Sequence, residues 1–205
     1  MKRHFYKGNQ SFLDKVFALD FILIFAVILL GVISIFAMYS TEQGIYGYYT
    51  QSHLYRFIIF FIIFIVSAFF KIDFWYKSAY FLYLLILILL VGVDFIGITA
   101  SGSKRWINLF FINLQPSELM KVMLILFLSR YYYKIPSGNV TNIKYILIPV
   151  FVIFVPVLLV AAQPDLGTAV LILIGGITVI WLTGFRIKYF LYSFLGLLVL
   201  FPLGI

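Results

Sequence analysis

Long apolar runs recur along this 205-residue chain, and they constrain its fold more than any other feature. Several of them reach about 18 residues or more, the length that an α-helix needs to cross the hydrocarbon core of a bilayer. Inside that core every backbone N–H and C=O group must find a partner within the protein, so the runs predict helices. The apolar fraction is 64%, whereas soluble domains average roughly 45–50%. The sequence therefore predicts an all-α integral membrane protein, a polytopic helical bundle.

Seven apolar segments are predicted to be transmembrane helices: residues 17–39, 54–70, 78–98, 116–133, 143–162, 166–184 and 188–205. No connection between them is long enough to separate domains, so residues 1–205 are predicted to form a single transmembrane domain. The first run is too long for a signal peptide and lacks a small-residue cleavage site, which predicts that it remains as a helix.

The distribution of Lys and Arg predicts the orientation, because cytoplasmic loops of membrane proteins are enriched in these residues. A cytoplasmic N-terminus places most of them on the inner side: Lys2, Arg3, Lys7, Lys15, Lys71, Lys77, Arg130, Lys134, Lys144, Arg186 and Lys188. The outer side then receives Arg56, Lys104 and Arg105. We therefore predict a cytoplasmic N-terminus, with residues 40–53, 99–115 and 163–165 outside.

Composition excludes several classes of function. The net charge of +8 is scattered between the apolar runs instead of gathered on one face, which argues against nucleic-acid binding. The chain has no Cys, so neither a disulfide nor a thiol-ligated metal can form. His4 and His53 stand alone, without the spacing of metal ligands.

The segment SGSKRWINLFFINLQPSELMK, residues 101–121, places charged side chains in a chain that is otherwise largely apolar. Pro116 suits the first turn of a helix, where its missing N–H costs nothing, and Glu118 complements the positive end of the helix dipole. A capped helix start does not account for Lys121, three residues further on the same face. Ionisable residues inside a membrane normally face a cavity or a partner. The pair Glu118–Lys121 therefore predicts a substrate cavity, with a structural ion pair as the alternative.

The segment QPDLGT, residues 163–168, repeats the Gln-Pro pattern at the outer start of a second inward-running helix. Asp165 lies in its first turn, and Gly167 and Thr168 leave room for close helix packing. Two helix N-termini of the same sense beside the basic pair Lys104–Arg105 would suit an anion such as a phosphate. A chance repeat of two common helix starts is the alternative.

Asp94 lies close to the outer end of the third predicted span. A carboxylate in that position can simply reach water. It can also pair with Arg105 or Lys104 across the following loop and support a site electrostatically. The sequence leaves both interpretations open.

Four stretches together resemble a known family. VDFIG, GSKRWI, LQPSELMK and QPDLGTA are similar to signature stretches of the shape, elongation, division and sporulation family, which includes RodA and FtsW. The similarity runs in order and spacing from about Leu84 to Gly184, and VDFIG favours the rod-shape branch. The residues that match the family's motifs are Asp94, Arg105, Gln115, Pro116, Ser117, Glu118, Lys121, Gln163, Pro164, Asp165 and Gly167.

The resemblance implies a multi-pass protein of the bacterial inner membrane, a peptidoglycan glycosyltransferase of cell elongation and cell-shape maintenance. Its substrate would be lipid II, a disaccharide-pentapeptide on undecaprenyl pyrophosphate, and its partners a class B penicillin-binding transpeptidase and membrane lipids. The implied substrate or cavity residues are Arg105, Lys104, Glu118, Lys121, Asp94, Gln115, Ser117, Asp165 and Gln163. A divalent cation, Mg or Mn, could bridge the pyrophosphate to a carboxylate, although the sequence offers no ligand set.

Family members usually have ten spans and a large outer loop after the seventh, and this loop carries an aspartate regarded as catalytic. Residues 1–205 contain no counterpart of that loop, which predicts that no catalytic residue lies in this chain and that it is inactive alone. The loop aspartate would be the base, and the present residues would stabilise the leaving pyrophosphate. The alternatives are a flippase or transporter of the lipid-linked precursor, and a non-catalytic scaffold for the transpeptidase.

Overall fold

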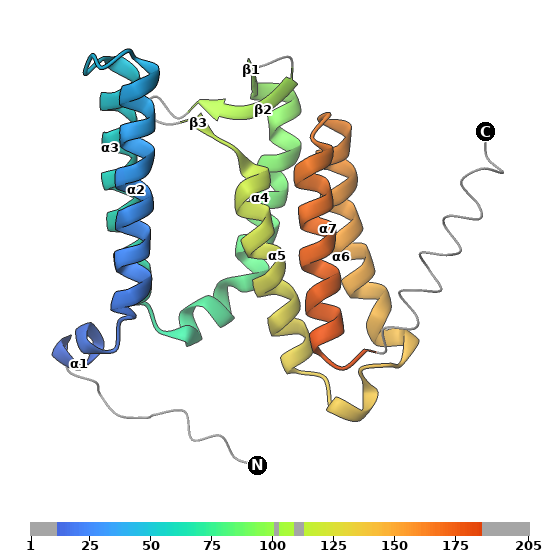
Figure 1. Cartoon of the computed structure of the whole chain (residues 1–205). Coiled ribbons are helices and arrows are strands. Elements are labelled where there is room, and N and C mark those ends of the chain that lie inside the picture. The colour runs from blue at the N-terminus through green and yellow to red at the C-terminus, as the bar shows by residue number, and fades with distance from the viewer. Residues whose placement is uncertain (1–11, 101–102, 109–112, 186–205) are drawn as a thin grey trace. The chain divides into compact units, whose positions relative to one another are not determined.

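The computed structural model describes residues 12–100, 103–108 and 113–185. The chain divides into two compact units, Met1–Ile72 (unit 1) and Asp73–Ile205 (unit 2), which are described separately below (Figure 1). The predicted seventh span, residues 188–205, lies outside the described residues. That all of the chain forms one transmembrane domain stays a prediction.

Unit 1 is built on a pair of long helices. The short helix α1 (Phe12–Phe17) precedes α2 (Phe21–Thr41), and α3 (Tyr48–Ala68) follows. Helix α2 begins four residues later than predicted because Asp20 caps it, its side chain accepting a hydrogen bond from the Leu23 N–H at 3.0 Å. Helix α3 begins six residues earlier than predicted, before its apolar run starts.

The early start of α3 depends on Glu42, in the turn after α2. Its carboxylate accepts hydrogen bonds from the backbone N–H groups of Tyr49 and Thr50, at 3.1 and 2.8 Å, and from the Thr50 hydroxyl. These are donors that the first turn of a helix cannot satisfy internally. These hydrogen bonds lower the pKa of the Glu42 carboxyl. The bond from the Thr50 hydroxyl has the largest effect, and the backbone bonds lower the pKa further.

Gly31 lets α2 and α3 approach each other closely. A Cβ at this position would lie 2.2 Å from Cζ of Phe57 in α3, well inside van der Waals contact. We predict that Gly31→Val destabilises the protein by about 1–3 kcal/mol, the usual cost of overpacking. Thermal unfolding in detergent would measure the loss. Gly92→Val is the matched control, because nothing lies within 4 Å of a Cβ there, and equal stability of the two variants would contradict close packing at Gly31.

Unit 2 contains four long helices. They run side by side, with a small sheet at one end (Figure 1). They are α4 (Ile72–Ile96), α5 (Pro116–Tyr133), α6 (Ile143–Ala162) and α7 (Leu166–Leu182), with a 3₁₀ turn, η1 (Ser137–Asn139), between α5 and α6. The predicted bounds of α5 and α6 are confirmed, and α7 ends two residues before its predicted end. Helix α4 begins six residues earlier than predicted.

Apolar stripes at helical spacing hold unit 2 together. Helix α5 buries Met120, Leu124 and Leu128, which pack in one cluster with residues of α4, α6 and α7. Gly176 of α7 brings that helix against α6, where a Cβ would lie 2.6 Å from Cγ1 of Ile153. Small residues allow such close approach of membrane helices. This core fixes the ends of α5 and α7 relative to one another.

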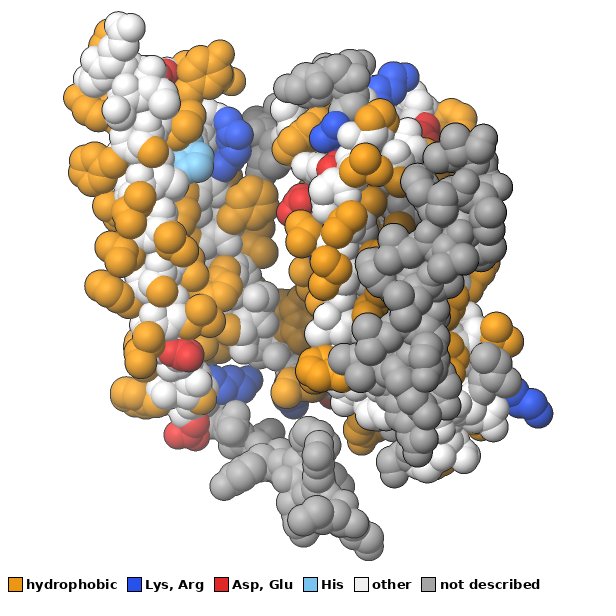
Figure 2. All heavy atoms as spheres, turned by 45° about the vertical axis from the view of Figure 1, so that its right-hand side comes forward, with side chains coloured by type: hydrophobic (Ala, Val, Ile, Leu, Met, Phe, Trp, Pro, Cys, Tyr) orange, Lys and Arg blue, Asp and Glu red, His pale blue; other side chains and the backbone are white. Residues whose placement is uncertain are grey.

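In the described part of the chain, four helices are long and apolar enough to cross a membrane: α2, α3, α4 and residues Lys144–Ala162 of α6. Helix α7 is apolar but shorter, and α5 carries Glu118, Lys121 and Arg130. Hydrophobic side chains cover much of the visible helix surface (Figure 2). The prediction of an all-α bundle with membrane-spanning helices is confirmed, and the number of seven spans stays a prediction.

The connection between α4 and α5 forms a three-stranded antiparallel sheet that the sequence analysis did not predict. Its strands are β1 (Ile98–Ala100), β2 (Ser103–Asn108) and β3 (Asn113–Leu114), in the order β1-β2-β3. Ile98 pairs with Trp106, and Ile107, which is buried, pairs with Leu114. The sheet therefore holds β2, with Lys104 and Arg105, at the N-terminal end of α5.

Candidate functional site

Two helix N-termini meet beside β2. Gln115 is the N-cap residue of α5, and Asp165 is the N-cap residue of α7. The Gln115 side-chain amide donates a hydrogen bond to Oδ2 of Asp165 at 3.1 Å. The two Gln-Pro segments that the sequence analysis singled out therefore lie in direct contact.

Arg105 connects β2 to the turn between α6 and α7. Its Nη2 donates a hydrogen bond to the Pro164 carbonyl at 2.9 Å, and its Nη1 lies 3.7 Å from Oδ2 of Asp165. The Asp165 side chain is only 12% exposed and the Arg105 side chain 30%. The other Asp165 oxygen, Oδ1, accepts a hydrogen bond from the Thr168 N–H at 3.2 Å and so caps α7.

Gln163 connects the same turn to α4. It is buried, and its side-chain amide donates to the Leu90 carbonyl at 3.1 Å and to Oδ1 of Asp94 at 3.2 Å. Asp94 therefore pairs with Gln163, while Arg105 pairs with Asp165. The predicted alternative, a contact of Asp94 with Arg105 or Lys104, is not among the contacts of the described residues.

Arg105 retains hydrogen-bonding capacity. A guanidinium group has five N–H donors, and within the described residues one hydrogen bond engages it. Its buried Nε has no hydrogen-bond partner there. The N-termini of α5 and α7 add the positive ends of two helix dipoles, the second of which the Asp165 carboxylate already caps. This arrangement can hold an anion with charge-assisted hydrogen bonds.

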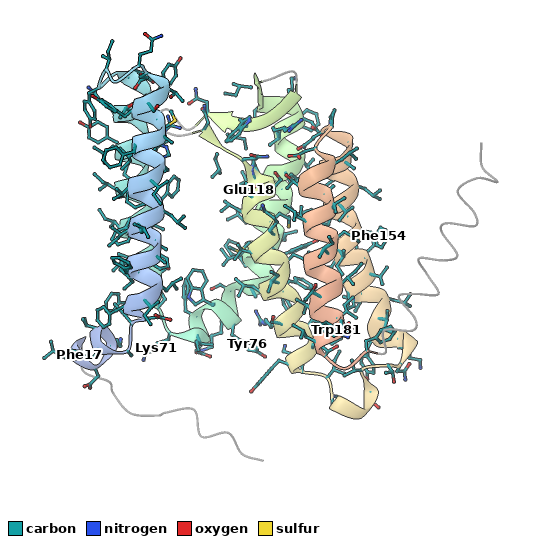
Figure 3. All side chains as sticks on the ribbon, viewed as in Figure 1. Phe17, Lys71, Tyr76, Glu118, Phe154 and Trp181 are labelled. Atoms are coloured by element: carbon teal, nitrogen blue, oxygen red, sulfur yellow. The ribbon has the colours of Figure 1, made fainter. Side chains whose placement is uncertain are left out.

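Glu118 and Lys121 form a separate ion pair within α5. The Lys121 Nζ donates to both Glu118 oxygens, each at 2.8 Å. Glu118 lies near the sheet end of α5 (Figure 3), and its side chain is 53% exposed, against 28% for Lys121. At 1.5 Å per residue, the two positions lie roughly 5 and 9 Å along the axis from Gln115. The pair therefore continues the polar end of unit 2 into the helix.

The remaining predicted residues flank the cluster. Lys104 is exposed and pairs with Thr99 of β1, beside a β-bulge that leaves Arg105 as the extra residue of β2. Ser117 is buried in the first turn of α5. Of the predicted residues, contacts therefore join Arg105, Gln115 and Asp165 in one group, Gln163 and Asp94 in a second, and Glu118 and Lys121 in a third.

The described residues do not form a metal site by themselves. Across residues 12–100, 103–108 and 113–185, no three His, Asp or Glu side chains gather closely enough to hold an ion. Asp165 and Asp94 each engage a glutamine amide instead. The bridging Mg or Mn ion stays a prediction of the sequence analysis.

Sequence reasoning missed two contacts that build this site. The Pro164 carbonyl accepts from Arg105, and the Leu90 carbonyl accepts from Gln163. Both acceptors are backbone groups, which leave no residue-specific mark in a sequence. The glutamine before each proline was the available signal, since a buried amide requires a hydrogen-bond partner.

Comparisons with known proteins agree with this picture. The chain is similar to peptidoglycan glycosyltransferase MrdB of Helicobacter pylori, with 34% identity over 193 residues, 91% of this chain and 48% of that protein. It is 41% identical to MrdB of Escherichia coli over 107 residues, 51% of this chain and 28% of that protein. The chain thus spans less than half the length of these relatives.

The fold is also found in a solved structure. A chain from the structure of a peptidoglycan synthase complex, described as coordinating polymerization and crosslinking, superposes with a TM-score of 0.80. At 24% identity the match covers 90% of this chain and 54% of that one. The sequence profile of the FtsW/RodA/SpoVE family, described as cell cycle proteins, matches residues 17–204. With a match over nearly its whole length, this integral membrane protein belongs to the FtsW/RodA/SpoVE family.

Proposed function

We propose that this chain contributes the pyrophosphate-binding part of a peptidoglycan glycosyltransferase that polymerises lipid II during cell elongation. The observation that carries the proposal is the convergence of Arg105 with the N-termini of α5 and α7. A leaving pyrophosphate develops negative charge, and fixed donors and dipoles at that position stabilise the transition state. The reaction class comes from the relatives, which are named peptidoglycan glycosyltransferases.

In this proposal each group of residues has its own role. Arg105 and the two helix N-termini hold the pyrophosphate, and Lys104 adds positive charge nearby. Gln115 and Asp165 fix the two helix starts relative to each other, and Gln163 and Asp94 fix the turn to α4. Glu118 and Lys121 line the cavity that receives the polar headgroup. The general base would be the aspartate that the family resemblance places in a later outer loop, beyond these residues.

The proposal includes a partner and a location. A class B penicillin-binding transpeptidase would crosslink the strands that the polymerase makes. The site would face the outer leaflet of the bacterial inner membrane, where lipid II presents its headgroup. This follows from the predicted cytoplasmic N-terminus, which places the loop with Arg105 outside.

Lipid binding and polymerisation by residues 1–205 test the proposed function. We expect the purified polypeptide in detergent to bind undecaprenyl pyrophosphate more tightly than undecaprenyl monophosphate, because the two lipids differ only in the pyrophosphate, and to form no glycan strands from lipid II. Isothermal titration measures binding, and gel analysis of labelled lipid II measures polymerisation. Equal affinity for the two lipids would contradict a pyrophosphate site. Glycan strands would show that the base lies within residues 1–205.

A flippase is the alternative function. It would move lipid II across the membrane of a vesicle, and neither residues 1–205 nor a full-length version would polymerise lipid II.

The orientation is tested by cysteine labelling, which the Cys-free sequence makes clean. Gln43 lies in the turn between α2 and α3, and Asn139 in η1, and both are exposed. We expect an impermeant thiol reagent added to intact spheroplasts to label Gln43→Cys but not Asn139→Cys. Permeabilised cells are the control, because both positions should then react. The reverse pattern would overturn the predicted orientation and the placement of Arg105 outside.

A further inference from the structure

A second cationic cluster lies at the opposite end of unit 2, and the proposed function does not use it. Arg130, near the end of α5, packs its guanidinium over two rings of α4, with Cζ 4.2 Å from the Tyr80 centroid and 5.0 Å from that of Tyr76. Its Nη1 donates to the Lys77 carbonyl at 2.6 Å. Figure 3 places Tyr76 toward the end of α4 that is remote from the sheet.

Arg130 is held rigidly but is not neutralised. Within the described residues, no carboxylate contacts Arg130, and its buried Nε has no hydrogen-bond partner. Lys134, one turn further, is exposed and has its Nζ 5.9 Å from the Tyr80 ring. Stacking on the two rings already restricts the conformations of the Arg130 side chain. Binding a planar or tetrahedral anion therefore costs little further conformational entropy.

The charges at this end do not balance. The acidic residues of the chain from Asp73 onward are Asp73, Asp94, Glu118 and Asp165. The last three lie toward the sheet end of their helices, and Asp73 pairs with Lys77 at 2.6 Å. Arg130, Lys134 and, at the start of α6, Lys144 are therefore left in excess. The acidic residues of unit 2 therefore supply no carboxylate for these three groups.

The surroundings of these basic residues favour a lipid over a soluble anion as their partner. Tyrosine rings beside basic side chains are typical of the depth at which membrane proteins meet lipid headgroups. From Lys77 an apolar stripe continues along α4 at helical spacing through Phe81, Leu84 and Ile88, which are 67%, 53% and 60% exposed. A soluble anion would leave this stripe uncovered, whereas the acyl chain of a lipid would cover it.

We propose that Arg130, Lys134 and the rings of Tyr76 and Tyr80 bind the phosphate of an anionic phospholipid, with its acyl chain along the stripe on α4. The lipid would tie α4 to α5 at the end remote from the site with Arg105. Basic pockets between transmembrane helices are a recognised type of site for anionic headgroups.

Native mass spectrometry of residues 1–205 in detergent, titrated with phosphatidylglycerol or phosphatidylcholine, tests this site. We expect phosphatidylglycerol to bind more tightly. Arg130→Gln and Lys134→Gln should each weaken that binding about fivefold, the effect of one basic residue near an anionic headgroup. Asp73→Asn should strengthen it, because it removes the one carboxylate at this end and releases Lys77.

Arg56→Gln is the matched control, since it removes the same charge from unit 1, where Arg56 bonds to Ser52 of its own helix. Its phosphatidylglycerol affinity should equal that of the unmodified chain. If the two lipids bound equally, the proposal would be overturned. If Arg56→Gln weakened phosphatidylglycerol binding as much as Arg130→Gln does, the binding would depend on the net charge of the chain and not on this site, and the proposal would also be overturned. If excess inorganic phosphate displaced the lipid, the site would bind a soluble phosphate, and the proposal that it binds a lipid would be overturned. Should Arg130→Gln fail to fold, Lys134→Gln and Asp73→Asn decide the outcome through their opposite signs.

Discussion

Replacing Arg105 with alanine is expected to reduce glycan-strand synthesis about 10²–10³-fold, the usual cost of removing a fixed donor from a developing anion. The folded state should lose little, because the Arg105 side chain is 30% exposed and partly exposed ion pairs contribute at most about 1 kcal/mol. The substitution is made in a full-length version that contains these residues, because residues 1–205 alone are expected to form no glycan strands. Glycan-strand synthesis, restoration of rod shape and the amount of protein in the membrane are measured together.

Two further variants separate binding from packing at Arg105. Arg105→Lys keeps the charge but loses the planar fork, so it should rescue only in part if the guanidinium contacts a phosphate through two donors. Arg56→Ala is the control, because it removes an arginine that is also predicted to lie outside and whose bonds stay within its own helix. Normal cell shape with Arg105→Ala at normal abundance would exclude the proposed role. A loss of membrane protein equal to the loss of shape would assign Arg105 to folding instead.

Removing both charges of the Glu118–Lys121 pair in a full-length version should abolish rod shape while leaving a folded protein. The Glu118 side chain is 53% exposed, and a partly exposed ion pair contributes at most about 1 kcal/mol, so Glu118→Gln with Lys121→Met should reach normal membrane abundance. If the pair lines the substrate cavity, its function nevertheless disappears. Complementation of a rod-shape defect, with quantification of membrane protein, measures both effects.

The single substitution distinguishes the structural interpretation of this pair. Were the pair only structural, Glu118→Gln alone would harm the protein more than the double change, because it leaves the Lys121 ammonium without its carboxylate. Abundance should then fall in the single variant and recover in the double variant. Full complementation by the double variant at normal abundance would rule out a cavity role.

The helices of this protein could be predicted where their limits are local. Pro116 begins α5 as a proline in the first turn does. Asn142 begins α6 with its side chain accepting from the Lys144 N–H at 3.2 Å. The start of α3 could not be predicted in this way, because Glu42 caps it from outside the helix, seven and eight residues before the groups it binds.

The candidate site was predictable in its residue types but not in its pairings. The charges of Lys104 and Arg105 and the repeated Gln-Pro starts stand out against an apolar sequence. Which acid meets which base depends instead on how the turn between α6 and α7 approaches α4 and β2. From the sequence, Asp94 could pair with either Arg105 or Lys104. In the structure it instead accepts a hydrogen bond from Gln163. The small sheet that positions Arg105 was missed because its strands are short and lack a regular alternation.

The turn between α6 and α7 also limits how this protein can be altered. Its three consecutive residues each reach a different neighbour: Gln163 reaches α4, the Pro164 carbonyl reaches β2, and Asp165 reaches α5. Inserting or deleting one residue there would displace all three contacts at once, so the length of this turn is fixed. Engineered tags, chain breaks and epitope insertions are better placed at Gly138 and Asn139 of η1, which are exposed and for which the described contacts of Asn139 are backbone hydrogen bonds.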